Sequence, residues 1–158
     1  MNIKLRDARD EDGDQLIALI ERCYAEYRGC ILDVDGEVPE LKAIATHHAK
    51  SGGRFWVAES GGQLVGSVGV VSGSAPGVME MKKVYVAKDA RQMGLGARLC
   101  SLAEAEAMSR RATDVELWSD TRFEDAHRMY ERRGYVPGPT RELHDKSKSI
   151  ERYFRKAL

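Results

Sequence analysis

The feature that most constrains the fold is a junction at residues 83–107, KVYVAKDARQMGLGARLCSLAEAEA, where a strand-like segment passes through two glycines into an alanine-rich helix. Unpaired N–H groups and the partial positive charge at a helix start stabilise an anion. Glycine lets the backbone approach such an anion closely. The sequence therefore predicts a phosphate-bearing ligand at Gly94 and Gly96.

Two common nucleotide-binding motifs do not fit this junction. A dinucleotide fingerprint requires G-x-G-x-x-G, but Leu99 stands where the third glycine would follow Gly94 and Gly96. A P-loop requires Gly-Lys followed by Ser or Thr, and the sequence contains no such triplet. What remains is Arg91-x-x-Gly94-x-Gly96, directly after the strand-like VYV of residues 84–86.

The hydrophobic pattern predicts one mixed α/β domain over residues 1–158. The Gly61-Gly62 pair between two apolar runs indicates a hairpin, and the strand–helix–strand unit at 80–119 favours one parallel, right-handed crossover. We expect roughly six to seven strands and about four helices. The expected strands are 2–8, 54–60, 63–72, 78–86, 113–119, 135–143 and 149–158, and the expected helices are 10–27, 39–50, 95–111 and 122–134.

Charge and hydropathy argue against several classes of protein. The chain carries 25 Lys and Arg against 25 Asp and Glu, a balance that argues against a nucleic-acid binder. No apolar run reaches transmembrane length, and the N-terminal MNIKLRDARDED lacks the apolar core of a signal peptide. We therefore expect a cytoplasmic protein without membrane contact.

The cysteines and histidines show no metal-ligand spacing, so we expect no metal site. An odd cysteine count without a C-x-x-C pair is typical of reduced thiols that act as small core residues. His47 and His48 are adjacent and would point to different sides of a helix, and we expect both to be solvated.

At the glycine junction the chain resembles the GNAT superfamily of acetyl-CoA-dependent N-acyltransferases. That family carries R/Q-x-x-G-x-G/A between its fourth strand and third helix, and AHRMYERRGY at 126–135 is similar to its A-x-x-x-Y-x-x-x-G-F/Y. The element order fits over the whole length. The resemblance implies an acyltransferase with a mixed, mostly antiparallel sheet whose fourth and fifth strands splay apart. It also implies acetyl transfer from acetyl-CoA, as co-substrate, to an amine by direct attack in a ternary complex.

The resemblance also assigns a coenzyme site. Backbone N–H groups of residues 92–97 would hold the pyrophosphate, and the pantetheine arm would lie beside the fourth strand, bonded to the main chain at Val84 and Val86. A tight turn without a ligand is the alternative reading of the two glycines. The implied coenzyme-binding residues are Val84, Tyr85, Val86, Arg91, Gln92, Met93, Gly94, Leu95, Gly96 and Ala97.

Tyr130 is the implied general acid, because it matches the family tyrosine that approaches the coenzyme sulfur. It also follows Ala126 and Phe123 at helical spacing, so core packing is the alternative role. Phe123 itself departs from the family, in which many relatives carry asparagine at this place. The pantetheine contacts of that asparagine must be absent here or come from another residue.

Glu80 is the candidate base for the amine proton, because several family members carry a glutamate on this strand that acts through a water. A solvated or salt-bridged strand residue is the alternative. Glu80 shares one strand face with Lys82, Val84 and Val86 unless a β-bulge intervenes. A backbone N–H near Val84 would stabilise the developing oxyanion.

The acceptor site is implied to lie between the early helices and the last loop. The connector CILDVDGEVPE at 30–40 is acidic and follows two tyrosines, so a cationic amine is one reading and a solvated charge run is the other. The candidate acceptor-binding residues are Tyr27, Asp33, Glu37 and His144, and Asp145 beside His144 could also face the acceptor. The sequence leaves open whether the acceptor is a small-molecule or a peptide amine.

Two other functions stay open at this point. One is a non-catalytic acyl-CoA-binding sensor on the same fold, against which the intact Glu80 and Tyr130 count. The other is an unrelated α/β nucleotide-binding or interaction domain. The oligomeric state is not readable from the sequence, although dimers are common on this fold.

Overall fold

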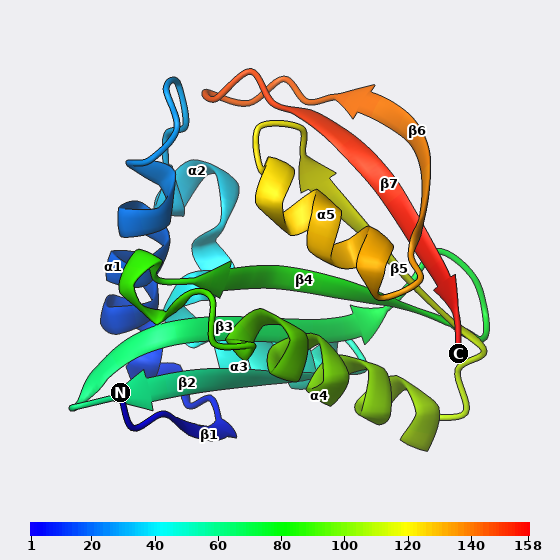
Figure 1. Ribbon diagram of the computed structural model, residues 1–158, viewed down its shortest axis with the longest axis horizontal. Coiled ribbons are helices and arrows are strands. Elements are labelled where there is room, and N and C mark those ends of the chain that lie inside the picture. The colour runs from blue at the N-terminus through cyan, green and yellow to red at the C-terminus, as the bar shows by residue number, and fades with distance from the viewer.

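The computed structural model describes all 158 residues and contains a seven-stranded sheet with the order β1-β2-β3-β4-β5-β7-β6 (Figure 1). Neighbouring strands are antiparallel except β4 and β5, which are parallel. The strands are β1 (Lys4–Asp7), β2 (Arg54–Ser60), β3 (Gln63–Ser72), β4 (Val78–Val86), β5 (Asp114–Asp120), β6 (Val136–Glu142) and β7 (Ile150–Ala157). The expected mixed sheet with one parallel pair is confirmed.

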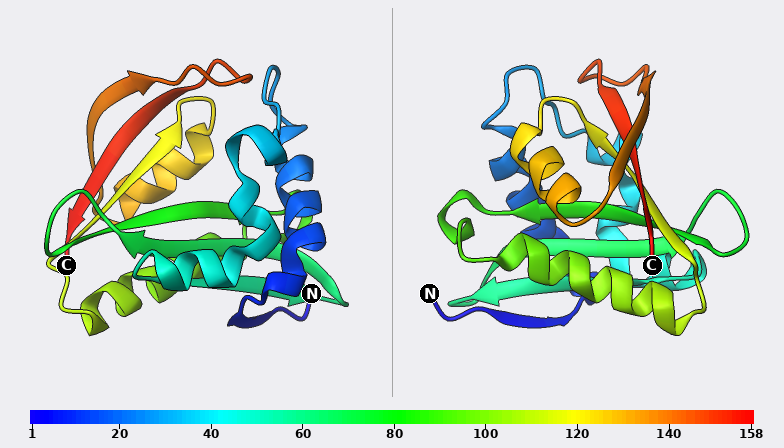
Figure 2. Two further views of the ribbon diagram at one scale, coloured as in Figure 1. Left: turned by 180° about the vertical axis from the view of Figure 1, so that it is seen from behind. Right: turned by 45° about the vertical axis from the view of Figure 1, so that its right-hand side comes forward.

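Helices cover both faces of this sheet. Opposite views show α1 and α3 on one face and α4 and α5 on the other (Figures 1 and 2). The α-helices are α1 (Gly13–Tyr24), α2 (Val34–Glu37), α3 (Ile44–Lys50), α4 (Leu95–Ser109) and α5 (Glu124–Arg132), and 3-10 turns span Asp10–Asp12, Pro39–Ala43 and Lys88–Ala90. Two of the differences from the expected helices lie between α1 and β2. The short helix α2 lies inside the expected irregular connector, and the helix expected at 39–50 begins as a 3-10 turn.

The hairpin β2–β3 forms the centre of the core. Gly61 and Gly62 adopt φ values of +58° and +79°, the left-handed region that a two-residue hairpin turn requires. Residues 55–58 and 64–71 are buried without interruption, because helices cover both faces of these strands. The ranges expected for β2, β3 and β4 are those observed.

Strands β4 and β5 separate along their length. Only Val78–Glu80 of β4 pair with Asp114–Glu116 of β5, so residues 81–86 have no strand partner on that side. Figure 1 shows the divergence, with β5 and β7 running obliquely to β4. The expected splay is therefore observed, and it leaves backbone groups of β4 open in the middle of the sheet.

A β-bulge interrupts β4 at Lys83, whose φ is +56°. The pairing with β3 shifts there, since Gly69 opposes Lys82 whereas Ser67 opposes Tyr85. The Oγ atom of Ser67 donates a hydrogen bond to the carbonyl oxygen of Lys83 (2.8 Å). This bond holds the extra residue of the bulge in place.

The bulge changes which side chains of β4 share a face. Opposed residues of an antiparallel pair lie on the same face, so the register places Tyr85 with Glu80 and Lys82. Val84 and Val86 lie on the opposite face. The sequence predicted that Glu80, Lys82, Val84 and Val86 share one face only if no bulge intervenes. Because the bulge is present, Glu80 and Val86 lie on opposite faces.

His48 departs from the expectation that both adjacent histidines are solvated. It is 1% exposed, its Nδ1 lies 3.1 Å from the carbonyl oxygen of Ile44, and its Nε2 has no hydrogen-bond partner. Burial lowers the pKa of His48 to about 4, so the ring is neutral and packs edge-on against Phe55. The prediction was wrong because α3 packs on the sheet, and one of two adjacent helical residues then faces the core.

Candidate active site

Helix α4 begins at the glycine pair. Gly94 precedes the helix with a φ of +77°, a conformation that costs glycine little. The first helical bond runs from the N–H of Arg98 to the carbonyl oxygen of Gly94 (3.0 Å), so the N–H groups of Leu95, Gly96 and Ala97 have no partner within the helix. No acidic residue occupies the first turn. This helix start therefore presents donors and a partial positive charge to an anion.

A cavity of about 630 Å³, which we call the glycine-loop cavity, lies against the start of α4. Helix α5 forms its other wall, and a Cβ atom at Gly96 would lie 2.9 Å from the Sδ atom of Met129. A side chain at residue 96 would therefore displace that of Met129 on α5. The lining consists of Cys23, Tyr27, Val84, Tyr85, Val86, Arg91, Gln92, Gly94, Leu95, Gly96, Ala97, Phe123, Asp125, Ala126, Arg128, Met129, Arg132 and Arg133.

Arg91 of the glycine motif ties the loop to the segment that follows α1. Its guanidinium makes a two-pronged ion pair with Glu26, with both N–O distances 2.6 Å, and its Nε donates to the carbonyl oxygen of Val86 (3.0 Å). The hydrogen bonds to Glu26 raise the pKa of Arg91. The charge of Arg91 is thus already matched by a carboxylate, and its main effect is to position the loop.

The free edge of β4 borders the glycine-loop cavity. The N–H of Ala87 donates to Val65 on β3 (2.8 Å), and alternate residues of an antiparallel strand point their backbone groups the same way. Val84 and Val86 therefore direct their N–H and C=O groups away from β3, toward the gap left by β5. The two positions predicted to bond the pantetheine arm face this open edge.

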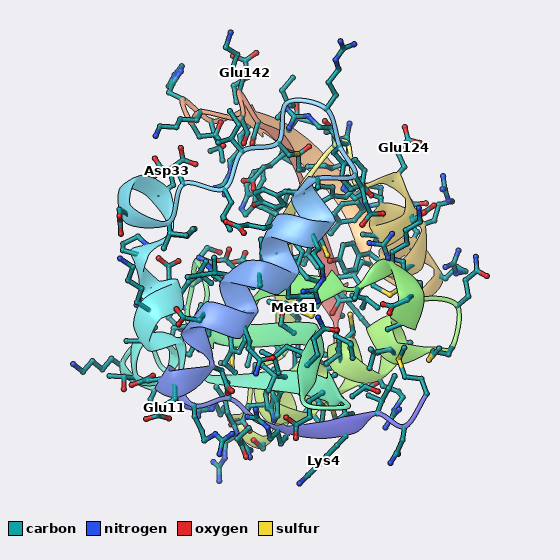
Figure 3. All side chains as sticks on the ribbon, turned by 90° about the vertical axis from the view of Figure 1, so that its left-hand side faces the viewer. Lys4, Glu11, Asp33, Met81, Glu124 and Glu142 are labelled. Atoms are coloured by element: carbon teal, nitrogen blue, oxygen red, sulfur yellow. The ribbon has the colours of Figure 1, made fainter.

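A second cavity of about 260 Å³, which we call the connector cavity, lies under the segment that joins α1 to α2. Figure 3 shows Asp33 beside α2 at the side of the molecule and Met81 near its middle. Five carboxylates and two lysines supply its charged groups. The lining consists of Tyr24, Cys30, Ile31, Leu32, Asp33, Glu37, Val38, Met81, Lys82, Lys83, Val84, Tyr85, Leu117, Trp118, Ser119, Asp120, Phe123, Tyr130, Leu143, Asp145, Ser147, Ser149 and Glu151.

The two cavities meet at three residues. Val84, Tyr85 and Phe123 line both of them. The ring of Phe123 lies 4.9 Å from that of Tyr27, and the hydroxyl of Tyr85 lies 3.3 Å from that of Tyr24. A group bound in one cavity therefore adjoins a group bound in the other at this junction.

Tyr130 lines the connector cavity. The residue is 4% exposed, and its ring packs against Tyr135 and Phe154 with centroid distances of 5.8 and 5.6 Å. Its hydroxyl makes no hydrogen bond within the protein. Burial raises the pKa of Tyr130 well above its usual value, so the side chain is a neutral donor. The ring is part of the core, while the hydroxyl is free to bond a group in the cavity.

Glu80 lies on β4 beside Met81 and Lys82, which line the connector cavity, but it lines neither cavity itself. Burial raises the pKa of Glu80, and the ammonium group of Lys82 works against this rise. No hydrogen bond holds its carboxylate. Lys83, in contrast, is held by Glu40 with an N–O distance of 2.9 Å.

The structure groups most of the predicted site residues. Of the ten predicted coenzyme-binding residues, all except Met93 line the glycine-loop cavity, and the side chain of Met93 is 47% exposed. Asp33 and Glu37 line the connector cavity, as expected of acceptor-binding candidates. Tyr27 lines the glycine-loop cavity instead. His144 is exposed and lines neither cavity.

Several lining residues were not predicted. Arg128 and Arg132 of α5 line the glycine-loop cavity, and their spacing of four residues was a signal for a common basic face. Asp120 lines the connector cavity. It lies at the end of β5, and no local pattern connects it with the predicted acceptor-binding residues.

A comparison with known families decides the class of the protein. The model of the acetyltransferase (GNAT) family matches residues 13–135, a range that holds the glycine motif and Tyr130. The chain belongs to this family. It is therefore an acyltransferase, as the motif implied, and the family as a whole transfers acetyl groups from acetyl-CoA.

Individual relatives agree with this assignment. The uncharacterized N-acetyltransferase YjgM of Escherichia coli is 26% identical over 129 residues, covering 79% of this chain and 77% of the relative. A GNAT-family acetyltransferase structure from Staphylococcus aureus superposes with a TM-score of 0.83 at 22% identity over 99% of both chains. The acetyltransferase yncA of Salmonella typhimurium, solved with its cofactor acetyl-CoA, gives 0.74 at 16% identity over 100% of this chain and 95% of that one. The two structural likenesses support the GNAT fold.

The remaining titratable groups form no further centre. No group of three or more His, Cys, Asp or Glu side chains is placed to hold a metal ion. Cys23 and Cys100 are buried, Cys30 is partly exposed, and none of the three is in a disulfide. None of the helices has the length and apolarity needed to cross a bilayer.

Proposed function

We propose that this GNAT enzyme transfers the acetyl group of acetyl-CoA to an amine bound in the connector cavity, by direct attack in a ternary complex. The observation that carries the proposal is the junction at Val84, Tyr85 and Phe123, where the two cavities meet. Substrates held on either side of this junction are neighbours, so the transfer needs no covalent enzyme intermediate.

The glycine-loop cavity fits coenzyme A in three respects. The free N–H groups at the start of α4 suit a pyrophosphate, and no carboxylate of the first turn opposes it. The carbonyl oxygen of Val86 already accepts from Arg91, so the backbone groups of Val84 and the N–H of Val86 remain for the amides of a pantetheine arm. The arginines of α5 supply positive charge beside both. Acetyl-CoA, when bound, supplies the thioester whose acetyl group is transferred.

Tyr130 acts as the donor to the leaving sulfur. Burial keeps its hydroxyl protonated across the physiological range, so it donates a hydrogen bond to the sulfur as negative charge develops there. The same burial raises the pKa of a thiol leaving group beside it, so the two pKa values shift in the same direction. The backbone N–H at Val84 stabilises the carbonyl oxygen from the open edge of β4.

Glu80 accepts the proton of the amine through a water. A primary amine is mostly protonated near neutral pH, so a proton must leave before the nitrogen attacks. Burial raises the pKa of Glu80 and makes it a stronger base than an exposed glutamate. Because Glu80 lines neither cavity, a bridging water completes the path from the amine to its carboxylate.

A screen of acetyl-CoA turnover across classes of amine tests the proposal. Thiol release gives the rate, and mass spectrometry identifies the acetylated product. We expect transfer to at least one amine class, with acetyl-CoA binding measured separately by calorimetry. Binding of acetyl-CoA without transfer to any amine would contradict the proposal and support a non-catalytic sensor.

A further inference from the structure

The connector cavity is bordered on one side by two segments far apart in the sequence. Residues 30–37 comprise the end of the α1–α2 connector and α2 itself, residues 143–149 join β6 to β7, and we call the pair the roof. The two segments approach each other at the top of Figure 1. The Oγ atom of Ser147 accepts from the N–H of Ile31 (2.8 Å) and donates to the carbonyl oxygen of the same residue (3.1 Å). Ser147 is buried, so this bridge is part of the packed structure.

Two further side chains hold the roof together. The Nζ atom of Lys146 lies 3.0 Å from a carboxylate oxygen of Asp33, and the backbone N–H of Lys146 donates to the carboxylate of Glu37 (3.0 Å). Arg122 donates from below to the carbonyl oxygen of Ser147 (2.5 Å) and to the Sγ atom of Cys30 (2.9 Å). Lys146 is exposed, so its ion pair alone contributes little. Together with the buried bonds it fixes the two segments relative to each other.

The small volume of the connector cavity limits the size of the acceptor. Its volume of about 260 Å³ lies below the range of roughly 300–1,000 Å³ that is usual for sites of drug-sized ligands. An extended peptide needs about 4.8 Å of clearance from a neighbouring backbone. To pass through, it would have to break the bonds made by Ser147 and Arg122. The cavity therefore suits a molecule of few heavy atoms.

The charged groups of the lining favour one class of small amine. Carboxylates outnumber ammonium groups five to two, and one of the two lysines, Lys83, is already paired with Glu40. Three cations outside the lining, Lys146, Arg122 and Arg141, offset part of this negative charge. Tyr130 lines the same space, and its hydroxyl makes no hydrogen bond within the protein. A second cationic group on the acceptor would be stabilised here, and a carboxylate would be repelled.

We infer that the acceptor is a small amine with a second positively charged group, and that the roof excludes polypeptides. The inference rests on the proposed transfer reaction and narrows its acceptor to one class. The size limit comes from buried bonds and is the stronger of the two preferences. The charge preference is weaker, because Lys146, Arg122 and Arg141, which lie outside the lining, offset part of the negative charge of the carboxylates.

The test compares four acceptors at saturating acetyl-CoA: a four-carbon diamine, the matching monoamine, the matching amino acid and a decapeptide with a free N-terminus and a lysine. We expect kcat/KM for the diamine to exceed that for the peptide by at least about 100-fold and that for the amino acid by about tenfold. A peptide that reacts as well as the diamine, or a preference for the amino acid, would overturn the inference.

A binding measurement separates this inference from the transfer reaction. The same compounds are titrated calorimetrically into the enzyme saturated with coenzyme A. Binding of the diamine without turnover would contradict the transfer reaction and leave the acceptor class supported. Failure of the diamine to bind would contradict the acceptor class, and turnover of any other amine would still support the transfer reaction.

A roof variant tests the size limit directly. Lys146→Gln combined with Ser147→Ala removes the bridges to Asp33 and Ile31, and we expect peptide turnover to rise about tenfold. Lys148→Gln is the control, because Lys148 lies on the same loop, is exposed and takes part in no side-chain hydrogen bond or ion pair. An unchanged peptide rate in a roof variant with the melting temperature of the wild type would contradict exclusion by the roof.

Discussion

The two cavities differ in charge, in size and in the way the chain builds them. The glycine-loop cavity, about 630 Å³, carries four arginines and one aspartate, whereas the connector cavity, about 260 Å³, carries five carboxylates and two lysines. The first is built largely from one continuous segment, residues 84–97, with α5 opposite. The second is assembled from loops and strands that bonds such as Ile31–Ser147 bring together.

This difference separates the two substrates physically. Backbone N–H groups recognise a phosphate whatever the neighbouring side chains are, and they need glycine only for close approach. Side chains and loop contacts recognise an acceptor, and they change with each substitution. Coenzyme binding and acceptor choice should therefore respond to different mutations, except at the shared residues Val84, Tyr85 and Phe123.

The largest expected effect comes from the hydroxyl of Tyr130. Tyr130→Phe keeps the packed ring and removes only the donor, so we expect kcat to fall by about 10² to 10⁴. The affinity for acetyl-CoA and the melting temperature should change little. Steady-state kinetics with calorimetry and thermal unfolding check the three quantities together. A variant that turns over at the wild-type rate would assign Tyr130 to packing alone.

Tyr135→Phe is the matched control for this change. Tyr135 is also buried, and its hydroxyl donates to Glu104 (2.7 Å) outside both cavities. Loss of this bond should lower the free energy of unfolding by about 1 kcal/mol and leave kcat unchanged. The two hydroxyl deletions should therefore give opposite patterns of rate and stability.

The next largest effect falls on the glycine-loop cavity alone. Gly96→Glu places a side chain against Met129 and a negative charge beside the proposed phosphate site. We expect coenzyme A to bind about 100-fold more weakly by calorimetry. Ala105→Glu makes the same charge change on an exposed face of α4 and should bind normally. Normal binding of coenzyme A by a folded Gly96→Glu variant would show that the phosphate does not bind at this loop.

Glu80 gives a smaller effect that depends on pH. The base acts when ionised, so wild-type kcat/KM should fall as the pH drops through the raised pKa of Glu80, above the ordinary value of 4.5. Glu80→Gln should lower the rate by about 10 to 100-fold at neutral pH and abolish this acid limb. An unchanged pH–rate profile would show that water alone accepts the proton.

The same substitution should stabilise the fold. The folded-state pKa of Glu80 lies above the unfolded-state value, so ionisation at neutral pH costs folding free energy. This cost is present above the raised pKa and disappears as the pH falls through it. Glu80→Gln should therefore raise the melting temperature at pH 7 and not at low pH. Thermal unfolding at the two pH values checks the sign.

The smallest expected effect concerns Arg132, which lines the glycine-loop cavity and makes no ion pair. Arg132→Gln should weaken coenzyme A binding several-fold at low salt, and less at high salt, because the side chain is exposed. Arg98→Gln, which removes an exposed arginine of α4 outside the cavity, should have no effect. Equal losses of coenzyme A affinity in both variants would mean that binding depends on the net charge of the protein and not on the position of Arg132.

Local chemistry made much of the fold predictable. Gly61 and Gly62 fix the hairpin turn, and the apolar runs on either side fix β2 and β3. The motif from Arg91 to Gly96 locates the strand-to-helix junction, because close approach to an anion needs glycine at defined places. These features depend on residues that are close together in the sequence, so a local sequence pattern is enough to predict them.

The connector cavity was less predictable, because its contacts are not local. Asp33 and Glu37 were found as an acidic run, but nothing in the run indicates that Lys146 bonds both. His144 and Asp145 were both candidates from the right loop, and only Asp145 lines the cavity. Which residue of a loop points inward depends on the segment that packs on it, and that segment is more than a hundred residues away.

The bulge at Lys83 has a consequence for engineering this enzyme. Before it, even-numbered side chains of β4 share the face of Glu80, and after it the odd-numbered Tyr85 takes that face. Deletion of Lys83 would remove the extra residue and leave both faces as they are, because Tyr85 would then lie two residues after Lys82. Loss of the bulge without a deletion would instead exchange the two faces of residues 84–86, turning Tyr85 away from Tyr24 and Val84 toward it. Transplanting acceptor specificity between relatives along β4 must therefore keep the parity of each half-strand, whatever the side chains chosen.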